Sequence, residues 1–181
     1  PLQRTLSADG NQLDYGTVRV RIDRDKRNAT LTVLAPQSAQ PTDADGIVTA
    51  GVNWWPLQLA RELDDAILHL RTNENEIGTW LLKTQGDASA VLASDSTLLA
   101  HQNHWLVRET IGFLRRVFSR LDVSSRSLFA IIEEDSCFVG SLLEIALAAD
   151  RSSLLVQGRG RGLSQERERE RGPAAELRPE V

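Results

Sequence analysis

The order of strand-like and helical segments is the feature that most constrains the fold of this chain. Residues 17–23 and 29–35 alternate apolar and polar side chains on either side of a polar break, which predicts a β-hairpin. Further along, short apolar runs of strand length alternate with segments in which apolar residues recur at helical spacing. Strands separated by helices of this length favour βαβ units and a largely parallel sheet. The predicted fold class is therefore α/β.

Three helices and three further strands complete the predicted order. The helices are expected over about 55–71, 97–121 and 141–149, and the strands over 79–84, 127–132 and 150–156. Residues 36–53 are expected to form a linker or crossover. Ser94 or Asp95 can cap the helix of 97–121, because short polar side chains accept hydrogen bonds from free N–H groups at a helix start. The four tryptophans are expected to be core or interface anchors.

Composition argues against several classes of protein. A formal net charge of -4 gives no electrostatic basis for general nucleic-acid affinity. A single cysteine, Cys137, excludes an intrachain disulfide and argues against a thiolate metal cluster. No window approaches the roughly 18 consecutive apolar residues of a membrane-spanning helix, and the N-terminus lacks a signal pattern. We therefore expect a soluble, cytoplasmic protein with no nucleic-acid and no membrane partner.

Both ends of the chain differ from its centre. The sequence contains no methionine and opens on PLQRTLSADG, so residues 1–16 are expected to be a linker from a preceding region of a longer polypeptide. Residues 17–156 are expected to form the core. Residues 157–181 are rich in Gly, Arg and Glu, which predicts a disordered tail because such a segment buries little apolar surface. Translation of a GC-rich gene in a wrong frame is a second interpretation of this tail.

Two loops are the candidate positions for a functional site. In βαβ units, ligands gather at the carboxyl ends of strands and at the N-termini of the helices that follow. The stretch QGDASAVLAS follows the strand of 79–84, and EEDSCFVGS follows the strand of 127–132. Each would present backbone N–H groups near a helix start. Two converging N–H groups form an oxyanion hole, which stabilises charge on a thioester carbonyl.

The two loops also carry a family resemblance. The stretch VGSLLEIALAAD, preceded by RSLFAII, resembles the second oxyanion element of the crotonase (enoyl-CoA hydratase/isomerase) superfamily. TWLLKTQGDASAVLASD lies where that superfamily places its first oxyanion donor. The resemblance implies a crotonase-like fold of ββα units, truncated at the C-terminus. The residues that it implies are Val91, Leu92, Gly140 and Ser141 for oxyanion stabilisation or substrate binding, and Glu144 as a catalytic acid.

Longer blocks are similar to one family within that superfamily. Three long stretches of this chain resemble the benzoyl-CoA-dihydrodiol lyase family: WWPLQLARELDDAILHLRTNENEIGTW, HWLVRETIGFLRRVFSRLDVSSRSLFA and SCFVGSLLEIALAADRS. The resemblance places this chain in the C-terminal of two crotonase-like halves, whereas the catalytic glutamates of the family lie in the N-terminal half. The implied reaction is hydrolytic opening of 2,3-epoxybenzoyl-CoA to a semialdehyde CoA ester with loss of formate. It needs an acyl-CoA substrate and no metal, flavin or nucleotide cofactor.

The chain departs from a full crotonase domain, and its candidate residues have structural interpretations too. The three-glycine turn is reduced to Gly140 with Ser141, which also fit a turn and an N-cap, and a second acidic loop is missing. Glu144 in a first helical turn is favoured by the helix dipole whether or not it is catalytic.

Other polar residues are expected to be structural. The acidic residues 133–135 fit a solvated loop, and Cys137 fits a buried thiol. His101 and His104 share a helix face, but no third ligand is evident at metal-binding spacing.

Three functions remain open from the sequence. The chain is part of the ring-opening lyase, or a non-catalytic half that packs against the N-terminal half or homo-oligomerises, or a different crotonase-like acyl-CoA hydratase or isomerase that uses Glu144. An exposed apolar patch and poor solubility are expected for the isolated chain.

Overall fold

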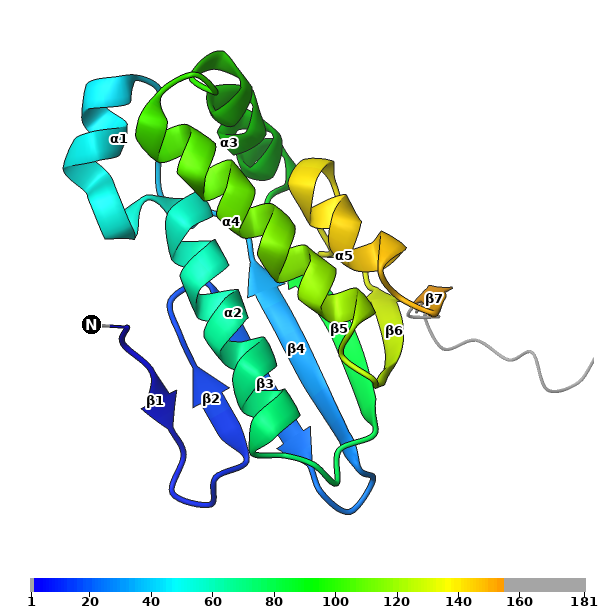
Figure 1. Cartoon of the computed structure of the whole chain (residues 1–181). Coiled ribbons are helices and arrows are strands. Elements are labelled where there is room, and N and C mark those ends of the chain that lie inside the picture. Colours follow the sequence, from blue (N-terminus) through cyan, green and yellow to red (C-terminus); the bar gives the residue numbers. More distant parts are fainter. Residues whose placement is uncertain (1, 155–181) are drawn as a thin grey trace, which may run out of the picture.

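The computed structural model describes residues 2–154, which form one mixed sheet of seven strands. The strands are β1 Thr5–Leu6, β2 Gln12–Asp14, β3 Val18–Asp23, β4 Asn28–Leu34, β5 Thr79–Gln85, β6 Ser127–Ile132 and β7 Arg151–Leu154. They are hydrogen-bonded in chain order (Figure 1). The pairings from β1 to β4 are antiparallel, and those from β4 to β7 are parallel.

The helices lie on one face of this sheet (Figure 1). They are α1 Ala44–Ala50, the 3-10 turn η1 Gly51–Asn53, α2 Trp55–Thr72, α3 Ala88–Ala100, α4 Trp105–Asp122, the 3-10 turn η2 Gly140–Leu142 and α5 Leu143–Leu147. In β3, Val18, Val20 and Ile22 are buried, whereas Arg19 and Arg21 between them are exposed. This alternation places the apolar side chains of the strand under the helices.

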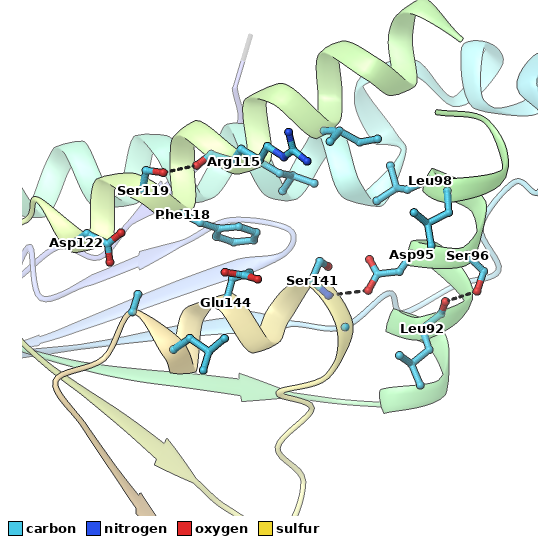
Figure 2. Close-up of a pocket in the computed structure, with 16 residues that line it drawn as sticks. Leu92, Asp95, Ser96, Leu98, Arg115, Phe118, Ser119, Asp122, Ser141 and Glu144 are labelled. Atoms are coloured by element: carbon cyan, nitrogen blue, oxygen red, sulfur yellow. Dashed lines mark hydrogen bonds between the residues drawn. The ribbon is translucent and has the colours of Figure 1, made fainter. Parts of the chain in front are cut away.

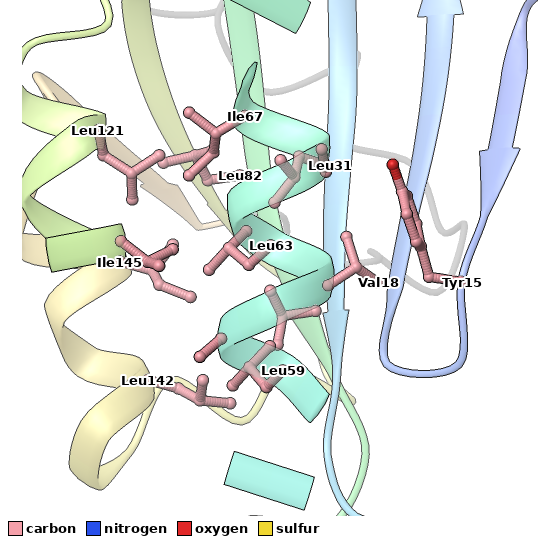
Figure 3. Packing of buried hydrophobic residues seen from close by; sticks show 14 of the residues in the cluster. Tyr15, Val18, Leu31, Leu59, Leu63, Ile67, Leu82, Leu121, Leu142 and Ile145 are labelled. Carbon is pink, nitrogen blue, oxygen red and sulfur yellow. The ribbon is translucent and has the colours of Figure 1, made fainter. Parts of the chain in front are cut away.

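The core lies between α2 and the central strands. Leu59, Leu63 and Ile67 recur every fourth residue along one side of α2 and are completely buried. Figure 3 shows them with Leu31 of β4 and Leu82 of β5, in the same apolar cluster. The helical spacing of these residues therefore accounts both for the helix and for the face that it buries.

A buried carboxylate joins α2 to the turn before β3. Glu62 accepts hydrogen bonds at Oε2 from the Thr17 N–H (2.5 Å) and the Thr17 hydroxyl (2.7 Å), and at Oε1 from Gln58 Nε2 (2.8 Å). Three donors satisfy both oxygens, so the acid is stable in the interior. A Cβ on Gly16 would meet the amide end of the Gln58 side chain and lie 3.2 Å from Oε1 of Glu62, so this turn packs closely against the helix.

Much of the predicted order is confirmed. The fold class is α/β, and the hairpin of 17–23 and 29–35 is the antiparallel pair β3 and β4. The helix of 55–71 is α2, and the strands of 79–84 and 127–132 are β5 and β6. The strand of 150–156 corresponds to β7, as far as the described residues extend.

Other expectations about the first part of the chain are wrong. Residues 1–16 include β1 and β2, which pair with the hairpin and leave the sheet parallel in only half of its pairings. These strands of two and three residues are too short to show an alternating pattern. Residues 36–53 contain α1, whose start is capped by Asp43 accepting the Gly46 N–H at 2.8 Å. Its Gly and β-branched residues give it a weak helical signal.

The single helix predicted over 97–121 is also wrong. The chain forms α3, which is capped by Asp87 rather than by Ser94 or Asp95, and then α4 after a break at residues 101–104. That break contains no glycine or proline, so the sequence carries no stop signal there. One consequence is that Trp105, expected to be an anchor, is 60% exposed, whereas the other three tryptophans are buried.

The helix expected over 141–149 is shorter than predicted. It consists of η2 followed by α5, which ends at Leu147. The tail of 157–181, for which disorder was predicted, lies outside the described residues.

We expect Leu63→Ala to lower the free energy of unfolding by about 2–5 kcal/mol, because it removes a fully buried side chain at the centre of the core and leaves a cavity. Urea denaturation followed by circular dichroism measures the change. The control is Leu99→Ala on α3, where the side chain is 66% exposed and the expected change is within about 0.5 kcal/mol. Equal effects of the two substitutions would contradict the packing described here.

Candidate functional site

Hydrogen bonds at the ends of β4 and β5 hold the loop that precedes α3. The Ala35 N–H donates to the Gln85 carbonyl at 2.9 Å, and the Gly86 N–H donates to the Asp135 carbonyl at 3.0 Å. Gly86 has a φ of +125°, and a Cβ there would lie 2.8 Å from the Cβ of Ala35. Glycine is required because both the conformation and the space exclude a side chain. The loop after β5 is thus fixed between the end of β4 and the loop after β6.

Side chains of β5 hold the loop after β6. The Thr84 hydroxyl accepts the N–H of Cys137 at 2.9 Å, and Lys83 Nζ lies 2.6 Å from a carboxylate oxygen of Glu133. One acid of the predicted solvated loop is therefore an ion-pair partner of the sheet. The loops after β5 and β6, which the sequence singled out separately, are held together by these contacts.

The start of α3 is a capped helix end. The Asp87 side chain accepts hydrogen bonds from the Ser89 hydroxyl and the Ser89 N–H, both at 2.8 Å, and these bonds lower the pKa of Asp87. The Val91 N–H donates to the Asp87 carbonyl at 3.4 Å, within the first turn. Val91 is fully buried, whereas Leu92 is 48% exposed. The N–H of Val91 is therefore committed to the helix and is not free for a ligand.

The turn before α5 is closed by a side chain of α3. Gly140 has a φ of +51°, which favours glycine, and the following Ser141 donates its N–H to Oδ2 of Asp95 at 2.7 Å (Figure 2). Leu142 and Ile145 on the other side of this segment are fully buried and anchor it to the core. The second candidate N–H group is thus also occupied.

An open groove of about 1020 Å³ lies between α3, α4 and α5. Its lining is mostly apolar, and Leu99 and Leu147 within it are 66% and 68% exposed. The charged side chains in the lining are Asp95, Arg115, Asp122 and Glu144. The groove is large enough for part of an acyl-CoA or for an apolar segment of protein.

Glu144 lies on the face of α5 that points toward α4 (Figure 2). It is exposed and occupies the first turn of a five-residue helix. Among the described residues, its carboxylate has neither a hydrogen-bond nor an ion-pair partner. The position therefore fits both the catalytic and the helix-dipole interpretation, and nothing in its surroundings holds it in one orientation.

The structure brings most of the sequence-predicted candidates together. Leu92, Gly140, Ser141 and Glu144 line the same groove, whereas Val91 is packed in the core behind it. Asp95, which the sequence indicated as a helix cap, is instead the partner of Ser141. No local pattern could have revealed this role, because the two residues are 46 positions apart and meet only in the folded chain.

The described residues contain neither a group of potential metal ligands nor a helix that could cross a membrane. His101 and His104, expected on one helix face, lie in the connection between α3 and α4. His101 Nε2 is 2.9 Å from the Thr42 carbonyl oxygen, which ties this connection to the segment before α1.

The fold and the groove define a mixed α/β protein in which the two loops after β5 and β6 meet beside an open apolar groove. The chain is 55% identical over 154 residues to benzoyl-CoA-dihydrodiol lyase of Aromatoleum evansii, and the match covers 85% of this chain. The resemblance to that lyase seen in the sequence is thereby confirmed. The chain spans only 27% of the length of this relative. No protein-family model matches the chain.

We expect Cys137 to react slowly with thiol reagents in the folded protein. The residue is fully buried, and burial raises the pKa of its thiol, so the reactive thiolate is scarce at neutral pH. The labelling rate with a chromogenic disulfide should be on the order of a hundredfold lower in the folded chain than in guanidinium chloride. The control is the double variant Cys137→Ala with Ser96→Cys, which places the only thiol on the exposed side of α3. Equally fast labelling of the two folded proteins would show that Cys137 is accessible.

Proposed function

We propose that this chain is part of a CoA-thioester ring-opening lyase of aerobic benzoate degradation, with a crotonase-like fold. The proposed reaction of the whole enzyme converts 2,3-epoxybenzoyl-CoA to a semialdehyde CoA ester and formate. The observation that carries the proposal is the 55% identity over 154 residues to a benzoyl-CoA-dihydrodiol lyase. The reaction calls for no metal, flavin or nucleotide cofactor, because the thioester itself accepts electron density once its oxygen is held. The enzyme is proposed to act in the cytoplasm.

Within that enzyme, the proposed role of this portion is architectural rather than catalytic. An oxyanion hole needs two free donors that converge on one oxygen. Here the Val91 N–H donates to the Asp87 carbonyl and the Ser141 N–H donates to Asp95. The candidate donors at Val91 and Ser141 are therefore already used within the chain.

The charge of the groove supports the same role. Three carboxylates, Asp95, Asp122 and Glu144, line it together with one cation, Arg115. The phosphates of CoA would meet a net negative surface there, which is electrostatically unfavourable. A cationic clamp for CoA is not among the described side chains of this groove.

The exposed apolar side chains support a packing role. Leu92, Leu99 and Leu147 are 48%, 66% and 68% exposed and border one groove. Exposed apolar side chains gathered at one groove mark either a protein interface or a ligand-binding groove, and the negative charge of this groove favours a protein interface over CoA. We propose the N-terminal half of the longer enzyme as the covering partner, with a second copy of the chain as the alternative.

One observation favours a different role. Glu144 faces the groove beside the Gly140 turn, as a working acid of an acyl-CoA hydratase or isomerase would. The two roles predict different effects when its charge is removed: almost no change in the architectural role and a large loss of activity in the catalytic one.

We expect Glu144→Gln in the full-length enzyme to leave kcat/KM for 2,3-epoxybenzoyl-CoA within about twofold of the unsubstituted value, because this carboxylate does not touch the reacting atoms in the proposed role. Formate release measures the reaction. Glu134→Gln, at an exposed acid outside the groove, is the control. A selective loss of roughly 10²–10⁴ for Glu144→Gln would instead identify it as a catalytic acid or base. Absence of formate release by the unsubstituted full-length enzyme would contradict the proposed reaction itself.

A further inference from the structure

Asp95 connects two elements that meet only across the groove. It lies in α3, and its Oδ2 accepts the Ser141 N–H at 2.7 Å from the turn that precedes α5 (Figure 2). A hydrogen bond to an ionised acceptor is roughly twice as strong as one between neutral groups. The carboxylate of Asp95 is therefore a strong hydrogen-bond acceptor for the Ser141 N–H.

The turn is shaped around the carboxylate. A Cβ on Gly140 would lie 1.9 Å from Oδ2 of Asp95 and 3.1 Å from its Cγ. The backbone of Gly140 thus packs directly against the acid, and a larger residue would force the two apart. The contact includes steric fit as well as one hydrogen bond.

The contact is also incomplete. The second oxygen of the carboxylate, Oδ1, is buried and has no hydrogen-bond partner among the described residues. Arg115 lines the same groove but forms no ion pair with Asp95. A buried oxygen without a partner is destabilising, so a purely structural contact would gain from a second donor at this place.

We infer that Asp95 is the residue that determines whether this groove accepts an acyl thioester. Its carboxylate takes the Ser141 N–H that a thioester carbonyl oxygen would need. A neutral carbonyl is a weaker acceptor than a carboxylate, so it does not displace the side chain. The inference rests on the proposed function for the identity of the ligand, a CoA thioester, whereas the closed contact is a property of the fold.

A residue that only stabilises the fold would behave differently from a residue that controls access. Truncation of a structural residue lowers stability and brings no affinity for a ligand. Truncation of a residue that controls access frees the Ser141 N–H and also removes one of the negative charges that repel CoA. Charge and access can be separated, because Asp122 lies in the same groove and can be neutralised without affecting the turn.

The experiment compares benzoyl-CoA titrations of the unsubstituted chain and of Asp95→Ala, Asp95→Asn and Asp122→Asn, by calorimetry and by the amide resonance of Ser141. We expect Asp95→Ala to shift the Ser141 resonance and to bind benzoyl-CoA at least about tenfold more tightly than the unsubstituted chain. Asp122→Asn controls for the loss of one charge and should change affinity by less than about threefold. Asp95→Asn keeps an acceptor of the same shape but a neutral, weaker one, so its affinity should lie between those of the unsubstituted chain and of Asp95→Ala. If Asp95→Ala does not fold, Asp95→Ser replaces it.

Three results would overturn the inference. These are a Ser141 resonance that does not respond to Asp95→Ala, a folded Asp95→Ala that binds no more tightly, and a gain for Asp122→Asn as large as that for Asp95→Ala. Failure of the proposed function is recognised separately, as absence of formate release by the full-length enzyme whatever residue stands at position 95.

Discussion

The parallel alignment of β4, β5 and β6 is the constraint on which the rest of the structure depends. Its registers place Leu31 beside Leu82, and Leu82 beside Ala130, so that one apolar row runs under the helices. The same alignment brings the three carboxyl ends to one edge of the sheet. There the Gly86 N–H reaches the Asp135 carbonyl, which fixes both candidate loops. The groove therefore follows from strand register, because α3 and α5 each begin at one of those loops.

Helix α2 packs on this sheet and stabilises it through two kinds of interaction. Its apolar side, which includes Leu59 and Leu63, removes surface from water, and this supplies most of the stabilisation. The buried Glu62 contributes specificity of packing, because its hydrogen bonds to Thr17 fix the place where the turn before β3 meets the helix. Because α4 packs on α2, the position of the groove depends indirectly on that acid.

Features set by local periodicity could be predicted from the sequence, and features set by tertiary contact could not. The hairpin and α2 carry a clear period of two or 3.6 residues, and β5 is a compact apolar run of strand length. The break at residues 101–104 has no glycine or proline, and β1 and β2 are too short for a pattern, so these were predicted incorrectly. In the site, Gly140 and Glu144 could be located by their resemblance to a known element. The partner of Ser141 could not, because Asp95 reaches it through space.

The difference between a working and a closed site can lie in one side chain. The elements that the resemblance indicated are still present, since Gly140 has a positive φ and Glu144 faces the groove. Sequence identity of this extent preserves packing and turn geometry, but catalysis also requires that the N–H donors are free. In this chain the N–H groups of Val91 and Ser141 are occupied, the first by the carbonyl of Asp87 and the second by Asp95. In the proposed architectural role, occupation of the N–H donors is what separates this portion from a catalytic one, while the fold that positions the donors stays the same.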